Sequence, residues 1–368
     1  MQKFILVSFL LLWNQIALGF ETKANQAILI DYNTKEIIFE KEAHTQMPPS
    51  SMSKMMTAYV AFEALKSGQI TLDEEFRTSE KSWRMEGTRM FIPLHSRVKF
   101  EDLLRGLIIH SGNDAAVSIA EMIGGSEEEF VSLMNEAAEK LGMNNTHFAN
   151  ATGLPDKDNY STAYDLAILA ERTISDFPQY YPYYAETRFT YNKIQQGNKN
   201  GLLYRNIGAD GLKTGYTDKA GFGLTGSIKK GNRRLIVVVN GLKSNHDRTN
   251  EAESLISYGL ANFINITIAR KDQVIEAVKV SNGDKKTVEM ITTKDAIFTL
   301  AKKDLKTLKA KIRYNSSVIA PIKEGDTMGQ IIIETNIGTK TYPLVAKSSV
   351  SKSNFIGRIG NNLSSFFD

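Results

Sequence analysis

Three short motifs along the chain contain residue types that could carry out chemistry together. In chain order they are Ser51-Met52-Ser53-Lys54, Ser111-Gly112-Asn113 and Lys213-Thr214-Gly215. A serine hydroxyl is a weak nucleophile until a neighbouring base removes its proton, and a lysine with a lowered pKa can act as that base. The motifs therefore predict an active-serine acyl-transfer site that uses lysine in place of histidine.

The surroundings of the first motif suit this chemistry. A Pro-Pro pair at residues 48–49 holds the chain extended, and the apolar run over residues 52–65 predicts a helix directly after it. Lys54 lies three residues after Ser51, so the two side chains emerge on one helix face. Burial and a second cation, for which Lys213 is the candidate, lower the pKa of a lysine. At a helix N-terminus, the backbone N–H of Ser51 can also face a developing oxyanion.

Each motif alone is short enough to occur by chance. The Ser-x-x-Lys pattern recurs at residues 227–230 and 349–352, and residues 66–68 are similar to the third motif. Context separates the copies, because only Ser51 follows an extended segment and begins an apolar helix. The copy at residues 227–230 runs into a turn between two strands.

Both helices and strands are expected to position these motifs. A strand hairpin is expected over residues 27–39, with later strands over 222–228 and 234–240. Helices are expected over residues 100–110, 115–123, 126–142, 164–174 and 251–263. Strands at both ends with helices between them predict one α+β domain, residues 20–266, whose first and last strands share a sheet.

From about residue 267 the pattern changes to short alternating runs. Turn-forming clusters at residues 281–284, 323–326 and 336–339 separate these runs. They predict a small all-β domain over residues 267–350. No cluster of reactive side chains is evident there, so a role as spacer or scaffold contact is expected.

The motifs and their surroundings resemble the low-molecular-mass penicillin-binding proteins, specifically the serine-type D-alanyl-D-alanine carboxypeptidases of the penicillin-binding protein 5 type. The likeness covers nearly the whole chain and is carried by residues 49–57, 106–115, 146–148, 198–203 and 210–221. It implies a β-lactamase/transpeptidase-like catalytic domain. It also implies removal of the terminal D-alanine from peptidoglycan stem peptides through an acyl-enzyme, binding of β-lactams, and a part in cell-wall biogenesis and cell shape.

The resemblance implies a catalytic role for three residues. Ser51 would be acylated, Lys54 would be its base, and Ser111 would relay a proton to the departing amine. The backbone N–H groups of Ser51 and Tyr216 would form the oxyanion hole. Because only the backbone of Tyr216 is needed, the identity of its side chain does not weaken this expectation.

The resemblance implies substrate binding by further residues. Asn113 would hold the substrate amide, Lys213 would supply a positive field within the motif that ends at Gly215, and Thr214 would lie near the terminal carboxylate. Arg248 would recognise that carboxylate, since a planar guanidinium can pair with both oxygens. Simpler roles remain open at this point: Asn113 or Ser111 could merely cap the following helix, and Arg248 could be a surface charge.

Two other classes of function compete with the carboxypeptidase. One is a β-lactamase or related serine esterase, and a class A β-lactamase needs a glutamate that activates the deacylating water. That glutamate usually lies in a Glu-x-x-Leu-Asn stretch, and the nearest candidate, residues 101–104, continues to Arg105. A non-catalytic wall-binding protein would not need Ser51, Lys54, Ser111 and Lys213 intact.

The composition excludes several kinds of chemistry. The chain has 368 residues and no cysteine, so disulfides, thiol catalysis and cysteine-based metal sites are excluded. Its five histidines are scattered without a metal-binding pattern, and no metal or cofactor is expected. A net charge of +4 suits an anionic partner such as a cell wall or a lipid surface, but it is too weak to predict nucleic-acid binding.

The two ends of the chain carry targeting signals. Lys3, the apolar run over residues 4–13, and the small residues Ala17 and Gly19 predict a signal peptide over residues 1–19; a buried first strand or helix is the alternative. Residues 351–368 predict an amphipathic helix on a membrane surface, with docking on the protein's own core as the alternative. The expected location is the periplasmic side of the inner membrane, with peripheral attachment.

Overall fold

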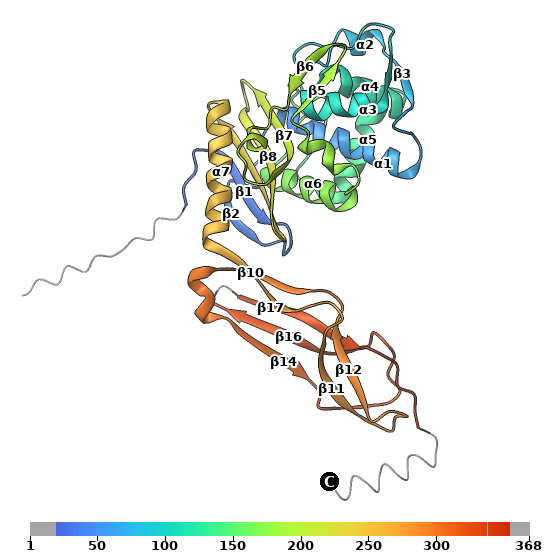
Figure 1. The fold of residues 1–368 in the computed structure, drawn as a ribbon, viewed down its shortest axis with the longest axis vertical. Helices are drawn as coiled ribbons and strands as arrows, with labels where there is room; N and C mark the ends of the chain where they lie inside the picture. The colour runs from blue at the N-terminus through green and yellow to red at the C-terminus, as the bar shows by residue number, and fades with distance from the viewer. Residues whose placement is uncertain (1–19, 337, 354–368) are drawn as a thin grey trace, which may run out of the picture.

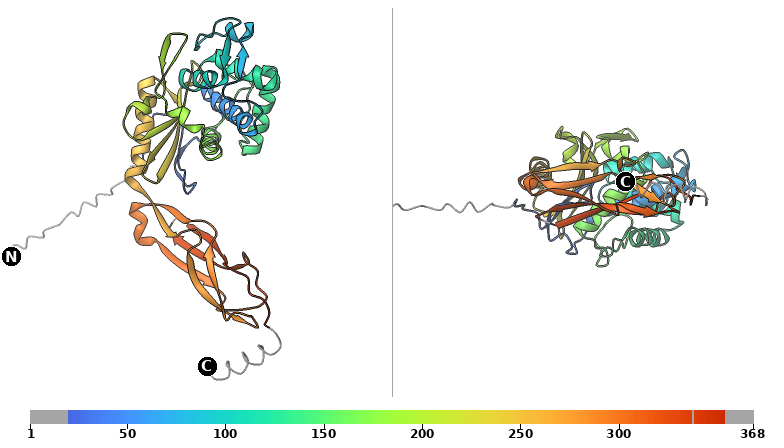
Figure 2. Two further views of the ribbon diagram at one scale, coloured as in Figure 1. Left: turned by 45° about the vertical axis from the view of Figure 1, so that its right-hand side comes forward. Right: turned by 90° about the horizontal axis from the view of Figure 1, so that it is seen from below.

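The computed structural model describes residues 20–336 and 338–353. The predicted signal peptide lies outside the described residues, as do residues 354–368 of the predicted C-terminal helix. The described chain forms one domain of helices and sheet and a second, elongated β domain that extends from it (Figures 1 and 2). Among the described helices, none has the length and apolar character needed to cross a bilayer.

An antiparallel sheet of five strands organises the first domain, in the order β2-β1-β9-β8-β7. Its strands are β1 (Gln26–Asp31), β2 (Ile37–Lys41), β7 (Ala209–Thr217), β8 (Gly221–Lys230) and β9 (Arg233–Leu242). The first strand of the domain pairs with the last, with Ala27 opposite Val239. This pairing confirms the predicted sheet, and in the described part of the chain no strand pairs with the outer edge of β7.

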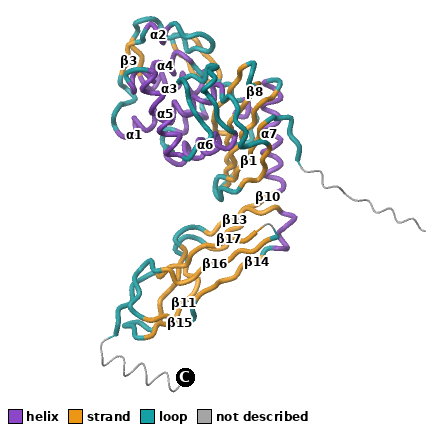
Figure 3. The backbone as a smooth tube through the Cα atoms, turned by 180° about the vertical axis from the view of Figure 1, so that it is seen from behind, coloured by secondary structure: helices purple, strands orange, loops and turns teal. Residues whose placement is uncertain are grey.

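Helices cover both faces of this sheet (Figures 1 and 3). Alternate residues of β9 point to opposite sides: Ile236 and Val238 join the core beneath the helical layer, whereas Val237 and Val239 pack against α7. The helical layer contains α1 (Lys54–Ser67), α3 (Phe100–Arg105), α4 (Asn113–Gly124), α5 (Glu127–Leu141) and α6 (Ala163–Asp176). The α+β architecture is therefore confirmed.

Helix α1 begins differently from the prediction. A 3₁₀ turn, Ser50–Ser53, contains the predicted nucleophile, and the α-helix follows from Lys54. Ser50 has a φ of 51°, which bends the chain sharply just before Ser51. Nearly all of α1 is buried, consistent with a helix at the centre of the domain.

Helix α7 (Asn245–Asn262) begins six residues before the predicted start at residue 251. The side chain of Ser244 accepts a hydrogen bond from the backbone N–H of Asp247 at 3.0 Å and so caps the helix. Arg248 therefore lies in the first helical turn, three residues before the predicted start of the helix.

Short elements connect the layers around the site. They are α2 (Glu80–Trp83), the strand pairs β3 (Glu75–Arg77) with β4 (Arg97–Lys99) and β5 (Arg188–Tyr191) with β6 (Ile194–Gly197), a π-helical turn (Gly106–His110), and 3₁₀ turns (Tyr181–Ala185 and Gly201–Tyr204). The π-helical turn ends α3 immediately before the second motif, and it delivers Ser111 in a left-handed conformation with a φ of 62°.

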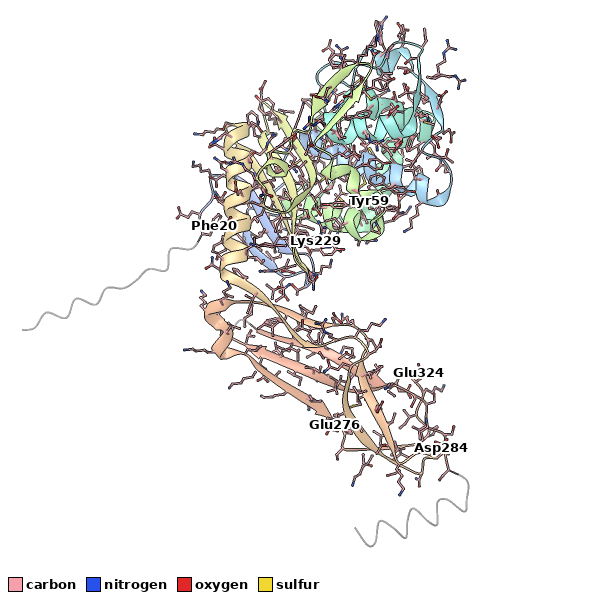
Figure 4. The ribbon with its side chains drawn as sticks, viewed as in Figure 1. Phe20, Tyr59, Lys229, Glu276, Asp284 and Glu324 are labelled. Atoms are coloured by element: carbon pink, nitrogen blue, oxygen red, sulfur yellow. The ribbon has the colours of Figure 1, made fainter. Side chains whose placement is uncertain are left out.

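The second domain is all-β, as predicted. Its strands are β10 (Phe263–Ala269), β11 (Val274–Ser281), β12 (Thr287–Thr292), β13 (Ala296–Ala301), β14 (Lys309–Tyr314), β15 (Ser317–Ile319), β16 (Thr327–Thr335) and β17 (Gly338–Ala346), with one 3₁₀ turn, Lys302–Thr307. They form a six-stranded sheet and the β10–β13 pair around a separate apolar core. Figure 4 places Asp284 at the end of this domain that lies far from the helical layer.

The two domains touch where β10 leaves α7. Asn265 donates a hydrogen bond to Asp31 Oδ1 at 3.1 Å, and Arg233 donates to the backbone oxygen of Phe263 at 2.6 Å. Arg233 also pairs with the buried Asp31 at 2.8 Å. A charged cluster thus ties the sheet of the first domain to the first strand of the second.

Candidate active site

The three motifs meet beside a cavity of about 600 Å³ at the edge of the central sheet. Six of the nine predicted site residues line this cavity: Ser51, Ser111, Thr214, Gly215, Tyr216 and Arg248. The other three are hydrogen-bonded to residues of the same group, namely Lys54, Asn113 and Lys213. Segments far apart in sequence therefore build one site.

Lys54 is the most enclosed of the charged residues in this site. Only 1% of its surface is exposed, and its Nζ donates to Ser51 Oγ at 3.2 Å, Asn113 Oδ1 at 2.7 Å and the backbone oxygen of Thr152 at 2.5 Å. Burial, followed by the positive charge of Lys199, lowers the pKa of Lys54 to about 7. A large fraction of this amine is therefore neutral near pH 7 and can accept the serine proton.

Ser111 and Lys213 form a second hydrogen-bonded pair across the cavity. Lys213 Nζ donates to Ser111 Oγ at 2.8 Å and to the backbone oxygen of Thr214 at 3.1 Å. Burial and then repulsion from Lys54 hold the pKa of Lys213 well below its usual range. Lys213 was the expected second cation, and the structure adds Lys199, whose charge acts on Lys54 directly.

The simple helix-capping roles for the second motif are ruled out. The residue at the cap of α4 is Gly112, and no side chain caps that end. Asn113 instead accepts from Lys54 and donates through Nδ2 to the backbone oxygen of Glu86 at 2.7 Å. Its amide therefore orients the lysine amine that faces Ser51.

Arg248 is buried, which excludes the surface-charge alternative. It is 5% exposed, and Nη1 donates to the backbone oxygens of Gly215 at 3.2 Å and Gly223 at 3.4 Å, while Nη2 donates to Asn245 Oδ1 at 2.5 Å. Burial lowers the pKa of Arg248 to about 10. Its Nε is buried without a partner among the described residues. A cation held this way at the cavity can bind an anionic group.

Gly215 lets β7 approach the nucleophile. A Cβ at this position would lie 2.9 Å from the backbone oxygen of Pro49 and 3.1 Å from Ser50 Cβ. Next to it, Tyr216 is 49% exposed, and its ring packs on Phe222 with centroids 4.2 Å apart. The third motif thus combines a close backbone contact with an aromatic side chain at the cavity mouth.

Sequence reasoning missed Lys199, which also lines the cavity. Its Nζ donates to Thr88 Oγ1 at 2.8 Å, and burial followed by the charge of Arg248 lowers its pKa. The residue lies between two buried asparagines, Asn198 and Asn200, within a segment that carried the family resemblance but had no assigned role. The signal available in the sequence was a lysine flanked by two asparagines.

Sequence reasoning also missed Asp114, which holds one wall of the cavity. Its buried carboxylate accepts backbone N–H bonds from Met90 and Phe91 at 2.9 Å and from Ile92 at 3.2 Å. The same segment offers the backbone oxygen of Thr88 to Asn113 N at 2.7 Å. Asp114 therefore fixes the segment that contacts both Asn113 and Lys199.

Within the part of the chain that the structure describes, no group of three or more His, Cys, Asp or Glu side chains is placed to hold a metal ion. Within the same part, the side chains that line the cavity beside Ser51 include no aspartate or glutamate. The charged side chains in this lining, Lys199 and Arg248, are cations, which suits a substrate that carries a carboxylate.

An antiparallel sheet, a helical layer and a buried lysine beside a serine define the class of active-serine enzymes whose base is a lysine. The family model for D-alanyl-D-alanine carboxypeptidase, peptidase S11, matches residues 14–244, and that for the penicillin-binding protein 5 C-terminal domain matches residues 263–352. The chain therefore belongs to the D-alanyl-D-alanine carboxypeptidase family.

Individual relatives agree with this assignment. The carboxypeptidase DacF of Bacillus subtilis is 35% identical over 91% of this chain and 87% of its own length, and DacD of Escherichia coli is 35% identical over 93% and 90%. Penicillin-binding protein 5 of Haemophilus influenzae superposes with a TM-score of 0.84 at 34% identity, over 91% of this chain and 99% of that structure. The ampicillin-bound penicillin-binding protein D2 of Listeria monocytogenes matches with a TM-score of 0.61 at 30% identity. This match covers 66% of the present chain and 99% of that structure.

Proposed function

We propose that this protein is a serine-type carboxypeptidase that removes the terminal D-alanine from the D-Ala-D-Ala end of peptidoglycan stem peptides. The observation that carries the proposal is the buried Lys54, with a pKa of about 7, which donates to Ser51 Oγ in a cavity that also contains Arg248. The curated relatives named above are D-alanyl-D-alanine carboxypeptidases.

The reaction begins with neutral Lys54, which takes the hydroxyl proton of Ser51. Ser51 Oγ then forms a bond to the carbonyl carbon of the penultimate D-alanine, and the negative charge that develops on the oxygen lies between the backbone N–H groups of Ser51 and Tyr216. Ser111 gives its hydroxyl proton to the amine as the peptide bond breaks and takes a proton in return from Lys213, whose Nζ donates to it. Terminal D-alanine leaves, and water then hydrolyses the ester.

Cations at the cavity recognise the end of the substrate. The terminal carboxylate binds Arg248 and Thr214, within the field of Lys213 and Lys199. The amide of Asn113 contacts the substrate amide while it keeps its bond to Lys54. These assignments are supported by the burial of Lys213 and Arg248 and by the place of Lys199 and Arg248 in the lining of one cavity.

The same geometry accommodates β-lactams. A β-lactam carbonyl acylates Ser51 and is released slowly, because the lactam nitrogen stays attached to the acyl group. The test is labelling with fluorescent penicillin: the native protein is labelled, and Ser51→Ala is not. An unlabelled native protein would favour the non-catalytic wall-binding alternative.

The β-lactamase alternative has less support. The glutamate considered from sequence, Glu101, pairs with Arg105 at 2.8 Å and accepts from Tyr183 at 2.9 Å, and it does not line the cavity. Steady-state assays with a D-Ala-D-Ala peptide and with a chromogenic cephalosporin separate the two functions. Turnover of the peptide, with only slow turnover of the cephalosporin, is the expected result.

We infer an exported protein that works on the periplasmic side of the inner membrane. In this proposal residues 1–19 are a signal peptide, residues 20–266 and 267–350 form the two domains, and residues 351–368 attach the protein to the membrane surface. The β domain then acts as a spacer. Fractionation of cells tests the attachment: deletion of residues 354–368 is expected to move the protein from the membrane to the soluble periplasmic fraction.

A further inference from the structure

Strand β14 lies at one edge of the six-stranded sheet in the second domain (Figures 1 and 3). It pairs with β16 on one side, and no strand of the described chain pairs with its other side. All six of its residues, Lys309–Tyr314, are exposed. The backbone N–H and C=O groups along the outer side of β14 therefore lack a strand partner, which makes this side a template for a strand from another chain.

One face of β14 is cationic. Side chains alternate along a strand, so Lys309, Lys311 and Arg313 share the face on which Lys311 pairs with Glu334 of β16 at 2.8 Å. Lys309 and Arg313 form no ion pair among the described residues. The run that leads into and through this strand, residues 302–313, contains six lysines or arginines and one aspartate. This edge of the sheet therefore carries excess positive charge.

The other face of β14 continues the core-facing side of the sheet, but nothing in the described chain covers it. Ile312 lies opposite Ile331 and Ala310 lies opposite Ile333, and both of these partners on β16 are buried in the core of the domain. Ile312 is nevertheless 46% exposed, and Tyr314 is 38% exposed. An added strand with apolar side chains on this face would extend the core and bury Ile312.

The charges decide which kind of partner fits this edge. Lysines on an edge strand protect it against unwanted pairing, and here they disfavour a second copy of the same chain. Two copies paired about a two-fold axis normal to the sheet would set the cations of one β14 against those of the other. An anionic polymer would match the cations, but it would leave the backbone groups and the apolar face without partners. An extended polypeptide with acidic residues on one face and apolar residues on the other matches all three features.

We propose that β14 is a docking edge for an extended segment of another protein, in which acidic residues alternate with apolar ones. The segment adds to the sheet beside β14, places its acidic side chains near Lys309, Lys311 and Arg313, and packs its apolar side chains on Ile312. The β domain then recruits a partner protein in addition to acting as a spacer. This role does not depend on the chemistry at Ser51.

Three fluorescently labelled hexapeptides test the proposal by anisotropy with the full chain. The first alternates glutamate and valine, the second has three glutamates followed by three valines, and the third alternates lysine and valine. The first should bind with a Kd about tenfold lower than the other two, because only its sequence matches both faces of β14. Equal binding of the first and second peptides would mean attraction by charge alone, as for an anionic polymer, and overturns the proposal. Absence of binding by the first peptide also overturns it.

Variants with reversed charge assign the binding to β14. Lys309→Glu combined with Arg313→Glu is expected to lose the glutamate–valine peptide and to bind the lysine–valine peptide, and this gain would show that the variant is folded. The matched control combines Lys279→Glu with Lys286→Glu, which makes the same change of charge at exposed positions on β11 and in the turn after it. The control should keep the native affinity for the first peptide. Equal losses in the two double variants overturn the proposal.

Hydrogen exchange in the native protein locates the bound peptide and decides the case if the charge-reversed variant binds neither peptide. Outer-edge amides within residues 309–314 should exchange more slowly when the glutamate–valine peptide is bound, since pairing supplies their acceptors. Amides of β15, at the opposite edge of the sheet, should exchange at the native rate. Slowed exchange at β15 alone, or at neither edge, overturns the docking edge. Penicillin labelling of Ser51 should stay at the native level in every variant, so a failure of docking is distinct from a failure of catalysis.

Discussion

Burial and neighbouring charges decide whether the amine of Lys54 carries a proton, and the pH dependence of the reaction follows from this. The pKa of Lys54 is lowered to about 7, so the amine is a free base above that pH and is protonated below it. We expect kcat/KM for a D-Ala-D-Ala peptide to rise through about pH 7. It should fall again where Lys213, whose pKa is also lowered, loses its charge. A pH–rate profile that peaks in acid contradicts a neutral lysine base.

Asp114 shifts the pKa of Lys54 in the opposite direction from burial and Lys199. Its charge raises the pKa of Lys54, so Asp114→Asn should shift the rising limb of the pH profile to lower pH. The variant also loses charge-assisted bonds to the segment at Met90–Ile92, and we expect about 1–3 kcal/mol lower stability. The control is Asp102→Asn, a change on α3 outside the cavity lining. It should leave the rising limb of the pH profile at its native position.

Arg248 is predicted to act through the geometry of its guanidinium. Arg248→Lys keeps a positive charge but loses the planar fork, so kcat/KM for a peptide with a free terminal carboxylate should fall about tenfold or more. A peptide that ends in a carboxamide should lose far less. Equal losses for both peptides would show that Arg248 does not bind the carboxylate.

Sequence predicted a serine and a lysine that the structure does bring together, because a nucleophile and its base must be of particular types at a particular spacing. Ser51 and Lys54 are neighbours on one turn, so local geometry was enough. Lys199 was missed because its place in the site depends on Thr88, which is 111 residues away in sequence. Long-range contacts of this kind leave no local pattern.

At the scale of elements, the close approach of β7 to the 3₁₀ turn is the critical contact. In Gly215→Ala, the added methyl group meets the backbone oxygen of Pro49 at 2.9 Å and pushes β7 away from Ser51. We expect acylation by penicillin to slow by at least about tenfold, since small displacements of reacting groups are costly. Gly197→Ala has its nearest neighbour at 3.5 Å and should react at the native rate. Similar rates for both variants contradict this account.

Element boundaries show what a local pattern cannot reveal. The start of α7 was predicted six residues too late, because residues 245–250 are polar and lack apolar periodicity. Tertiary contacts supply what the pattern lacks: Arg248 and Thr249 are both buried in that first turn. By contrast, α5 was predicted well, since Ser126 and Gly142 mark its two ends by their own backbone preferences.

At the scale of the whole molecule, the fold class and the separate β domain followed from alternating and helical periodicity. The junction between the domains did not follow, because it depends on Asp31 and Arg233, which are 202 residues apart. Neither residue stands in a recognisable motif. Their pairing becomes visible only once β1 and β9 lie side by side in the sheet.

This junction predicts a large effect on stability. Asp31→Ala leaves Arg233, whose side chain is 15% exposed, without its buried partner, and we expect about 3–5 kcal/mol lower free energy of unfolding by chemical denaturation. The exposed pair between Lys311 and Glu334 is the control, since Lys311→Ala should cost less than about 1 kcal/mol. Equal losses would mean that the junction contributes no more than a surface pair.

The cavity beside Ser51 is lined by Lys199 and Arg248, with Lys213 buried next to it, and its described lining offers no carboxylate to neutralise them. Such a one-sided field reaches beyond contact distance and draws anionic peptide ends inward before they touch the wall of the site. Dissolved ions shorten that reach to about 8 Å at physiological ionic strength. The rate of association with substrate should therefore depend on ionic strength. The bond-making steps inside the enclosed site should depend on it much less.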